Sequence, residues 1–81
     1  MPLTAVQCLG ARAMLRMPQA ELAEAVGIAR KSLATFEAEG SAPRPTTLER
    51  IRDYLEGRGI EFLETEAGLG VLLRSGEEES R

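Results

Sequence analysis

The 81-residue chain contains no histidine, no tryptophan and a single cysteine, Cys8. Without histidine, neither imidazole acid–base catalysis nor a zinc site of the ordinary Cys/His type is available. One cysteine cannot form a disulfide within the chain and suits a reducing compartment. The chain also lacks a phosphate-cradling glycine loop and a nucleophile beside an evident base. We therefore expect no enzymatic activity, no metal site and no cofactor.

Long apolar runs are also absent from the sequence. No run approaches the roughly 20 residues of a membrane span, and the first residues lack the charged and apolar regions of a secretory signal. We expect no membrane partner and a cytoplasmic location. With 43% hydrophobic and 28% charged residues, the composition is that of an ordinary globular chain with one small core.

The net charge of −3 at first argues against a nucleic-acid partner, because phosphate binding is largely electrostatic. The distribution of charge changes this conclusion. Residues 1–59 hold eight Arg/Lys and seven Asp/Glu, whereas residues 60–81 hold two and six. The acidic charge is therefore concentrated at the end. Residues 75–81, with three consecutive glutamates, are predicted to form a disordered acidic tail.

Hydrophobic periodicity predicts a pair of helices before residue 28. The first extends from Thr4, a suitable N-cap, to Arg16. Its inner stripe comprises Cys8, Ala11 and Leu15, with Met14 widening it. The second begins near Pro18 and ends at Gly27, a residue type that commonly takes the left-handed conformation at helix ends. The inner face of this second helix comprises Leu22, Ala23 and Val26.

Two further helices are predicted after Gly27. Residues 30–38 form a short helix that buries Leu33 and Phe36. Its outward residues are Arg30, Lys31, Ala34 and Thr35. A loop of turn-forming residues, EGSAPRP, follows. Thr46 and Glu49 have the spacing of a capping box and predict the start of the last helix, which runs to about residue 56.

The segments IEFLE and GVLLR, separated by TEAGL, predict a β-hairpin with a longer loop. Alternation places Ile60 and Phe62 on one face of it and Leu63 on the other. A lone hairpin can bury only one face against helices, so the leftover leucines and an open strand edge predict pairing with a second copy. We expect a homodimer whose interface includes Ile60, Phe62, Leu63, Val71, Leu72 and Leu73.

Several segments together resemble the phage Cro and repressor type of helix-turn-helix regulators, the XRE family. They are ARAML, QAELAEAVG, SLATFE, the PTTL of residues 45–48, and the ending GIEFLETEAGLGVLLR. The resemblance implies a mainly α, four-to-five-helix lambda-repressor-like fold. It places a DNA-binding domain at residues 1–59, the helix-turn-helix motif at about 18–38, and a C-terminal hairpin at 60–74.

The resemblance also implies roles for particular residues. Arg30, Lys31 and Thr35 occupy base-reading positions, beside Ser32, and Gln19 sits where the family contacts the DNA backbone. Arg12 and Glu37 match a structural ion pair of the family. The chain departs from the family pattern by having Pro18 and Ala29 in place of Ser or Thr caps, and Glu39 where glycine is common.

Ser41 and Arg44 lie in the loop after the predicted reading helix, where the DNA backbone would pass, so we expect phosphate contacts there. The combined interpretation is a regulator that binds double-stranded DNA as a homodimer on a near-palindromic operator, with repression as its effect. An alternative is a protein-interaction adaptor or antitoxin that grips a protein partner through the hairpin or the acidic tail. For Arg30 and Lys31 the competing interpretation is an ordinary solvated helix face.

Overall fold

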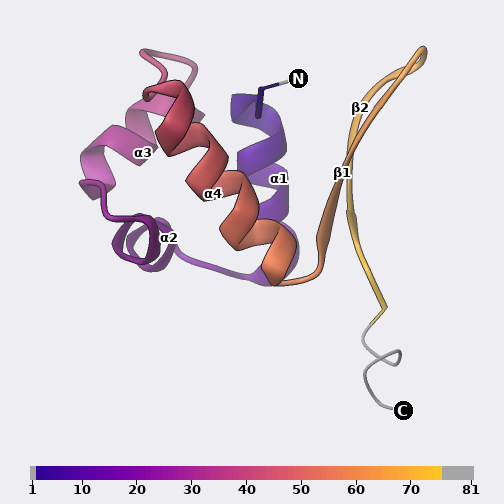
Figure 1. Cartoon of the computed structure of the whole chain (residues 1–81), viewed down its shortest axis with the longest axis horizontal. Helices are drawn as coiled ribbons and strands as arrows, with labels where there is room; N and C mark the ends of the chain where they lie inside the picture. Colours follow the sequence, from indigo (N-terminus) through magenta and orange to yellow (C-terminus); the bar gives the residue numbers. More distant parts are fainter. Residues whose placement is uncertain (1, 76–81) are drawn as a thin grey trace.

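The computed structural model describes residues 2–75, which form four α-helices followed by an antiparallel β-hairpin. The elements are α1 (Ala5–Leu15), α2 (Gln19–Val26), α3 (Arg30–Glu37), α4 (Pro45–Gly57), β1 (Ile60–Thr65) and β2 (Gly68–Leu73). In Figure 1, α1 and α4 lie between α2 and α3 on one side and the hairpin on the other. The predicted mainly α fold with a C-terminal hairpin is confirmed, with four helices. Apart from Ser75, the predicted acidic tail lies outside the described residues.

Helix α1 begins with a complete capping box. The Oγ1 atom of Thr4 accepts a hydrogen bond from the Gln7 backbone N–H (3.2 Å), and the Thr4 N–H donates to Oε1 of Gln7 (3.3 Å). This exchange satisfies two backbone donors that the first turn leaves without helical partners. The predicted N-cap is therefore confirmed. The helix ends at Arg16, which adopts a left-handed conformation (φ 54°) that is unfavourable for a non-glycine residue.

The turn between α2 and α3 follows the predicted pattern. Gly27 is left-handed (φ 80°) and closes α2, and the Ile28 N–H donates to the carbonyl of Ala23 at 3.0 Å. Pro18 and Ala29 stand at the two N-cap positions and provide no side-chain cap. The orientation of both helices therefore depends on their packing and on the contacts described in the next subsection.

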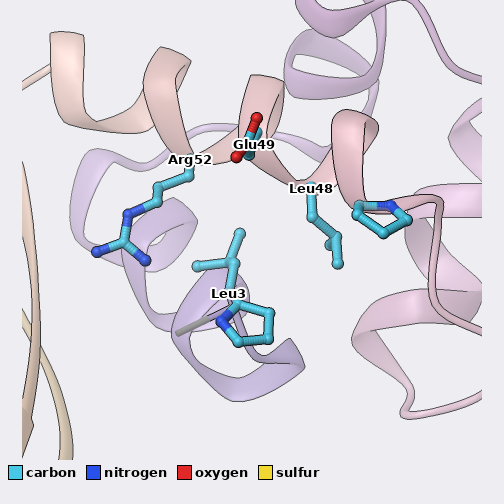
Figure 2. Close-up of a pocket in the computed structure, with 6 residues that line it drawn as sticks. Leu3, Leu48, Glu49 and Arg52 are labelled. Atoms are coloured by element: carbon cyan, nitrogen blue, oxygen red, sulfur yellow. The ribbon is translucent and has the colours of Figure 1, made fainter.

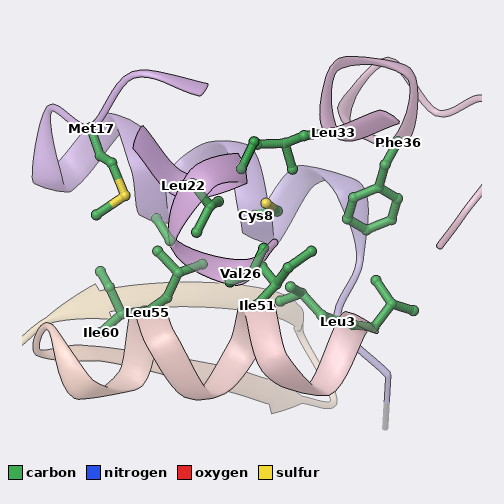
Figure 3. Close-up of a cluster of buried hydrophobic side chains, with 13 residues drawn as sticks. Leu3, Cys8, Met17, Leu22, Val26, Leu33, Phe36, Ile51, Leu55 and Ile60 are labelled. Carbon is green, nitrogen blue, oxygen red and sulfur yellow. The ribbon is translucent and has the colours of Figure 1, made fainter. Parts of the chain in front are cut away.

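The core lies where the four helices meet the first strand, as Figure 3 shows. Its largest fully buried side chains are Leu22, Leu33, Ile51, Leu55, Ile60 and Cys8. Cys8 is thus a core residue, as expected from its place on the inner stripe of α1. Met17 is also buried, but Met14 is 46% exposed, so the prediction that Met14 widens that stripe was wrong.

Helix α4 starts earlier than its sequence pattern indicated. Arg44 is the N-cap and Pro45 the first helical residue, so the predicted capping box of Thr46 and Glu49 is wrong. Proline suits a first helical position because its φ is already helical and its missing N–H would have had no helical partner there. Thr46 then lies inside the first turn, where its hydroxyl cannot act as an N-cap.

The hairpin is tighter than predicted. Each strand has six residues, and the connection consists of Glu66 and Ala67 only, in place of the five-residue TEAGL loop. Gly68 permits this turn by adopting φ 140°, and Oγ1 of Thr65 accepts a hydrogen bond from the Ala67 N–H (3.1 Å). The strands therefore extend further toward the turn than the hydrophobic pattern alone indicated.

One face of the hairpin rests on α1 and α4. Ile60 is buried, and Phe62 and the Val71 opposite it are half-buried against the core. The amide nitrogen of Gln7 donates to the carbonyls of Leu63 in β1 and Gly70 in β2, both at 3.3 Å. We call this side, with Ile60, Phe62 and Val71, the inner face, and the opposite side, with Leu63 and Leu72, the outer face.

Candidate nucleic-acid interface

Helix α3 presents a polar side to solvent. Its apolar residues Leu33 and Phe36 are buried, so the opposite side of the helix faces outward. The exposed side chains are those of Arg30, Lys31, Ser32 and Thr35. Ala34, which was predicted to face outward, is half-buried because it lies at the border of the packed side. The described part of α3 thus offers two adjacent cations and two hydroxyls on one surface.

Gln19, at the start of α2, links this surface to the interior. Its Oε1 atom accepts a hydrogen bond from Nη1 of Arg30 (3.2 Å), and its Nε2 atom donates to Oε1 of Glu37 (3.0 Å). A carboxylate can only accept hydrogen bonds, so the contact with Glu37 determines which end of the amide faces inward. The Gln19 oxygen is therefore left facing Arg30, and one amide hydrogen stays available to a further acceptor.

Arg12 and Glu37 form the buried anchor of α3. Nη2 and Nε of Arg12 lie 2.6 and 2.7 Å from the two carboxylate oxygens of Glu37, and the side chains are 13% and 3% exposed. Nη1 of Arg12 also donates to the carbonyl of Met17 at 2.7 Å. This fork-like pairing fixes α3 against α1 and the chain between α1 and α2.

The surroundings of Glu37 control the protonation of the whole cluster. Burial raises the pKa of the Glu37 carboxyl, but hydrogen bonds from Arg12, Gln19 and Cys8 outweigh it, so its pKa lies below the ordinary value. Burial raises the pKa of the Cys8 thiol well above its usual range, and the hydrogen bond from its Sγ to Glu37 (3.2 Å) raises it further. The thiol is therefore protonated and unreactive at neutral pH.

The loop after α3 turns sharply at Glu39 and Gly40. Glu39 adopts a left-handed φ of 65°, a conformation that favours glycine. The Gly40 N–H donates to the carbonyl of Thr35 (2.8 Å), and a Cβ at Gly40 would approach Cγ2 of Thr35 to 2.8 Å. The absence of a side chain at Gly40 therefore lets the loop pass close to the outward side of α3.

This close passage creates a shallow hollow between α3 and the loop. Its lining comprises Ala29, Lys31, Ser32, Thr35, Ser41, Ala42 and Pro43. Ser41 is thus brought next to the outward side of α3, as its predicted role requires. Arg44 is exposed but does not line the hollow, because it forms the N-cap of α4.

A second hollow lies between α4 and the residues before α1, and Figure 2 shows its lining. Leu3 and Leu48 form its apolar floor. Arg52, at its border, donates to Glu56 (3.0 Å) and lies over the ring of Phe62, 5.2 Å from the centroid. Its guanidinium is therefore occupied with α4 and β1. This hollow is separate from the outward side of α3.

Two supporting residues were not foreseen from the sequence. Gln7 contacts both strands of the hairpin, and Nη2 of Arg50 donates to the carbonyl of Val26 (3.1 Å) at the C-terminal end of α2. The Thr4/Gln7 spacing is a recognisable capping signal. The long-range contacts of Gln7 and Arg50 have no local signal, because they depend on how the helices pack.

Two other features are absent from the described part of the chain. Within residues 2–75, no cluster of His, Cys, Asp or Glu side chains could hold a metal ion. In the same residues, no helix combines the length and apolar character needed to cross a membrane.

The outward side of α3, its connection through Gln19 and the tight turn at Gly27 define a helix-turn-helix protein. A helix-turn-helix family model (HTH_3) matches residues 11–63, more than half of the chain. The chain therefore belongs to this family of Cro/XRE-type regulators and is a DNA-binding helix-turn-helix regulator. The resemblance noted from the sequence is thus confirmed. No curated protein sequence gives a significant match.

Proposed function

We propose that this protein is a sequence-specific transcriptional regulator that inserts α3 into the major groove of double-stranded DNA. Arg30 and Lys31 reach base edges, where both residue types suit the O6 and N7 acceptors of guanine, and Thr35 meets a thymine methyl group. The observation that supports this most strongly is the chain of contacts from the buried Arg12–Glu37 pair through Gln19 to Arg30. A side chain held in this way is better positioned for base reading than one on an ordinary solvated helix face.

In this proposal the remaining polar residues contact the DNA backbone. The second amide hydrogen of Gln19 is directed to a phosphate, since its other polar groups already bind Glu37 and Arg30. Ser32 and Ser41 face the same hollow beside α3 and suit further phosphate contacts. Arg44, at the exposed start of α4, supplies a charge where the backbone leaves this surface.

The regulator acts as a homodimer in the cytoplasm and binds a near-palindromic operator. One α3 carries two cations and a few hydroxyls, which is little for an operator-length site, and a twofold dimer doubles this set. Two α3 helices in successive major grooves would lie about one helical turn apart, roughly 34 Å. Repression by occluding the promoter is the effect that we propose.

The test is selection of bound fragments from random DNA with the native chain and with Arg30→Ala/Lys31→Ala. The native chain should enrich a near-palindromic sequence, and the double variant should lose the enrichment. Arg52→Gln is the control, because it removes one positive charge away from α3, beside the hairpin. If the double variant recovers the same sequences with the same strength, the assigned reading surface is wrong.

One observation favours the alternative of a protein-interaction adaptor or antitoxin. The outer face of the hairpin exposes Leu63 and Leu72 beside the acidic Glu61, an arrangement suited to a partner with apolar and basic groups. The same selection distinguishes the two functions. If the protein is an adaptor that works without DNA, the native chain itself should enrich no sequence.

A further inference from the structure

The two strands of the hairpin differ sharply in charge. β1 and the turn carry Glu61, Glu64 and Glu66, whereas β2 is GLGVLL and contains neither a charged residue nor a proline. Proteins protect exposed strand edges with charges, prolines or a covering element, because the unpaired backbone groups there invite another strand. β2 has neither of the first two protections.

The outer edge of β2 is also free. The Arg74 N–H donates to the Gly59 carbonyl (2.8 Å), which makes this pair a hydrogen-bonded position of the ladder. Such positions alternate along an antiparallel pair, so the backbone groups of Leu69, Val71 and Leu73 point away from β1. Among residues 2–75, β2 makes its strand-to-strand backbone hydrogen bonds with β1 alone.

Helix α1 carries a second apolar stripe on the same side as this edge. Val6, Leu9 and Ala13 are exposed, and their spacings of three and four place them on one face, opposite the core-facing Cys8 and Ala11. Because β1 contacts α4 and β2 contacts α1, the β2 edge points away from α4, as this stripe does. The backbone of α1 approaches β2 closely where Gly10 faces Val71, so the stripe borders the free edge.

Two ways of joining two copies through the hairpin differ in where they place α3. If the outer faces of two hairpins stack, the twofold axis lies parallel to the sheets. The two helical layers then lie on opposite sides of the dimer. Antiparallel pairing of two β2 edges needs an axis perpendicular to the sheet, which keeps both helical layers on the same side. Since α2 and α3 lie on the side of the helices away from the hairpin, only the second arrangement lets both α3 helices face one duplex (Figure 1).

The ends of β2 are complementary in charge for that arrangement. Glu66 precedes β2 in the turn, and Arg74 follows it directly. Antiparallel pairing of two β2 strands brings the end of one against the beginning of the other, so each Arg74 approaches the turn that carries the second copy's Glu66. A parallel pairing would place like charges together.

We propose that a second copy of this chain pairs with the free edge of β2, antiparallel to it, and forms a continuous four-stranded sheet. Val6, Leu9 and Ala13 of the two α1 helices meet beside the axis and complete the interface. The outer-face leucines Leu63 and Leu72 remain outside this interface, although the interface expected from the sequence included both. The choice between the two arrangements rests on the proposed DNA-binding function. The free, uncharged edge of β2 is observed independently of that function.

The test is sedimentation of the full chain without DNA, comparing Leu69→Lys and Leu9→Lys with the control Leu63→Lys. Leu69, Leu9 and Leu63 are exposed to a similar extent, 43%, 45% and 40%, so all three variants should keep the fold. The first two should weaken dimerisation about a hundredfold, because the twofold axis places each new charge in the interface twice. Leu63→Lys should sediment as the native dimer does.

Hydrogen exchange separates strand pairing from a contact of α1 alone. The amides of Val71 and Leu73 should be protected in the native dimer and exchange rapidly in Leu69→Lys, while the amides of α4 stay protected in both. A monomeric native chain at micromolar concentration overturns the proposal, as does dissociation by Leu63→Lys with Leu69→Lys still dimeric. A native dimer that selects no DNA sequence would refute the proposed function and leave this interface standing.

Discussion

The two ends of the molecule are held to its middle by different kinds of contact. At one end, α3 is tied to α1 by the buried Arg12–Glu37 pair and to α2 by Gln19. At the other, the hairpin rests on α1 and α4 mainly through the apolar Ile60, Phe62 and Val71. Directional polar contacts define the orientation of a helix closely, whereas apolar packing is tolerant of small shifts. The end for which we propose DNA contacts is the one with the directional contacts.

The largest loss of stability is expected at the α3 end, from Arg12→Ala. Removing the arginine leaves the carboxylate of Glu37 buried without its partner, and this should lower the free energy of unfolding by about 3 to 5 kcal/mol. Urea denaturation measures the loss. The control is Arg58→Ala, whose ion pair with Glu21 is about half exposed and 3.6 Å long, and which should change stability by less than about 1 kcal/mol. If both variants lose equally little, the buried pair does not anchor α3.

Acid should weaken the same anchor. The pKa of Glu37 is lower in the folded chain than its ordinary value of 4.5, so the folded state binds this proton less readily than the unfolded state. Its stabilising contribution is therefore complete above the ordinary value and is lost as the pH falls through the lowered pKa. Stability should decrease in acid more steeply for the native chain than for Glu37→Gln, as followed by thermal melts from neutral pH downward. Parallel pH profiles for the two chains would contradict this.

A smaller effect is expected at the hairpin end from Gln7→Met. The variant keeps the length of the side chain but removes the donor to the Leu63 and Gly70 carbonyls and half of the capping box, at a cost of about 1 to 2 kcal/mol. Hydrogen exchange should accelerate in β1 and β2 and leave α3 nearly unchanged. Equal acceleration in both regions would show that the two ends are not held independently.

The smallest effect should be a gain in stability at the turn after α3. Glu39→Gly relieves a left-handed conformation and should stabilise the chain by up to about 1 kcal/mol. Gly40→Ala is the contrasting variant, because its Cβ would press on the side chain and carbonyl of Thr35 and should destabilise the chain. Thermal melting should show a higher Tm for Glu39→Gly and a lower Tm for Gly40→Ala than for the native chain. A loss of stability in Glu39→Gly would show that the Glu39 side chain contributes more than its strain costs.

Local sequence patterns predicted the helices well, but they predicted the ends of helices and strands less accurately. The spacing of Leu22 and Leu33 within their segments located two core faces, and Gly27 located the turn between α2 and α3. The start of α4 was misplaced because two competing start signals lie one residue apart, and Pro45 prevails over Thr46. The hairpin loop was predicted too long because Gly68 allows a turn that hydrophobic alternation cannot reveal.

For the candidate site, the sequence indicated which residues belong to it but not how they are connected. Arg30, Lys31 and Thr35 follow from the outward face of a short helix, and their DNA contacts remain predictions. The link from Gln19 to both Glu37 and Arg30 could not be predicted, because these residues lie 18 and 11 positions away and meet only after the helices pack. Similarly, the second apolar stripe of α1 gained meaning only from its place beside β2.

The amino-acid sequence by itself determined the helix-turn-helix class, because apolar periodicity, Gly27 and the residues of α3 act within a few positions of one another. It also determined the uncharged character of β2. Only the tertiary structure determined which side chains brace α3 and which edge of the hairpin is left free. Those properties arise from contacts between distant segments, whose distances and directions are defined by packing of the whole core.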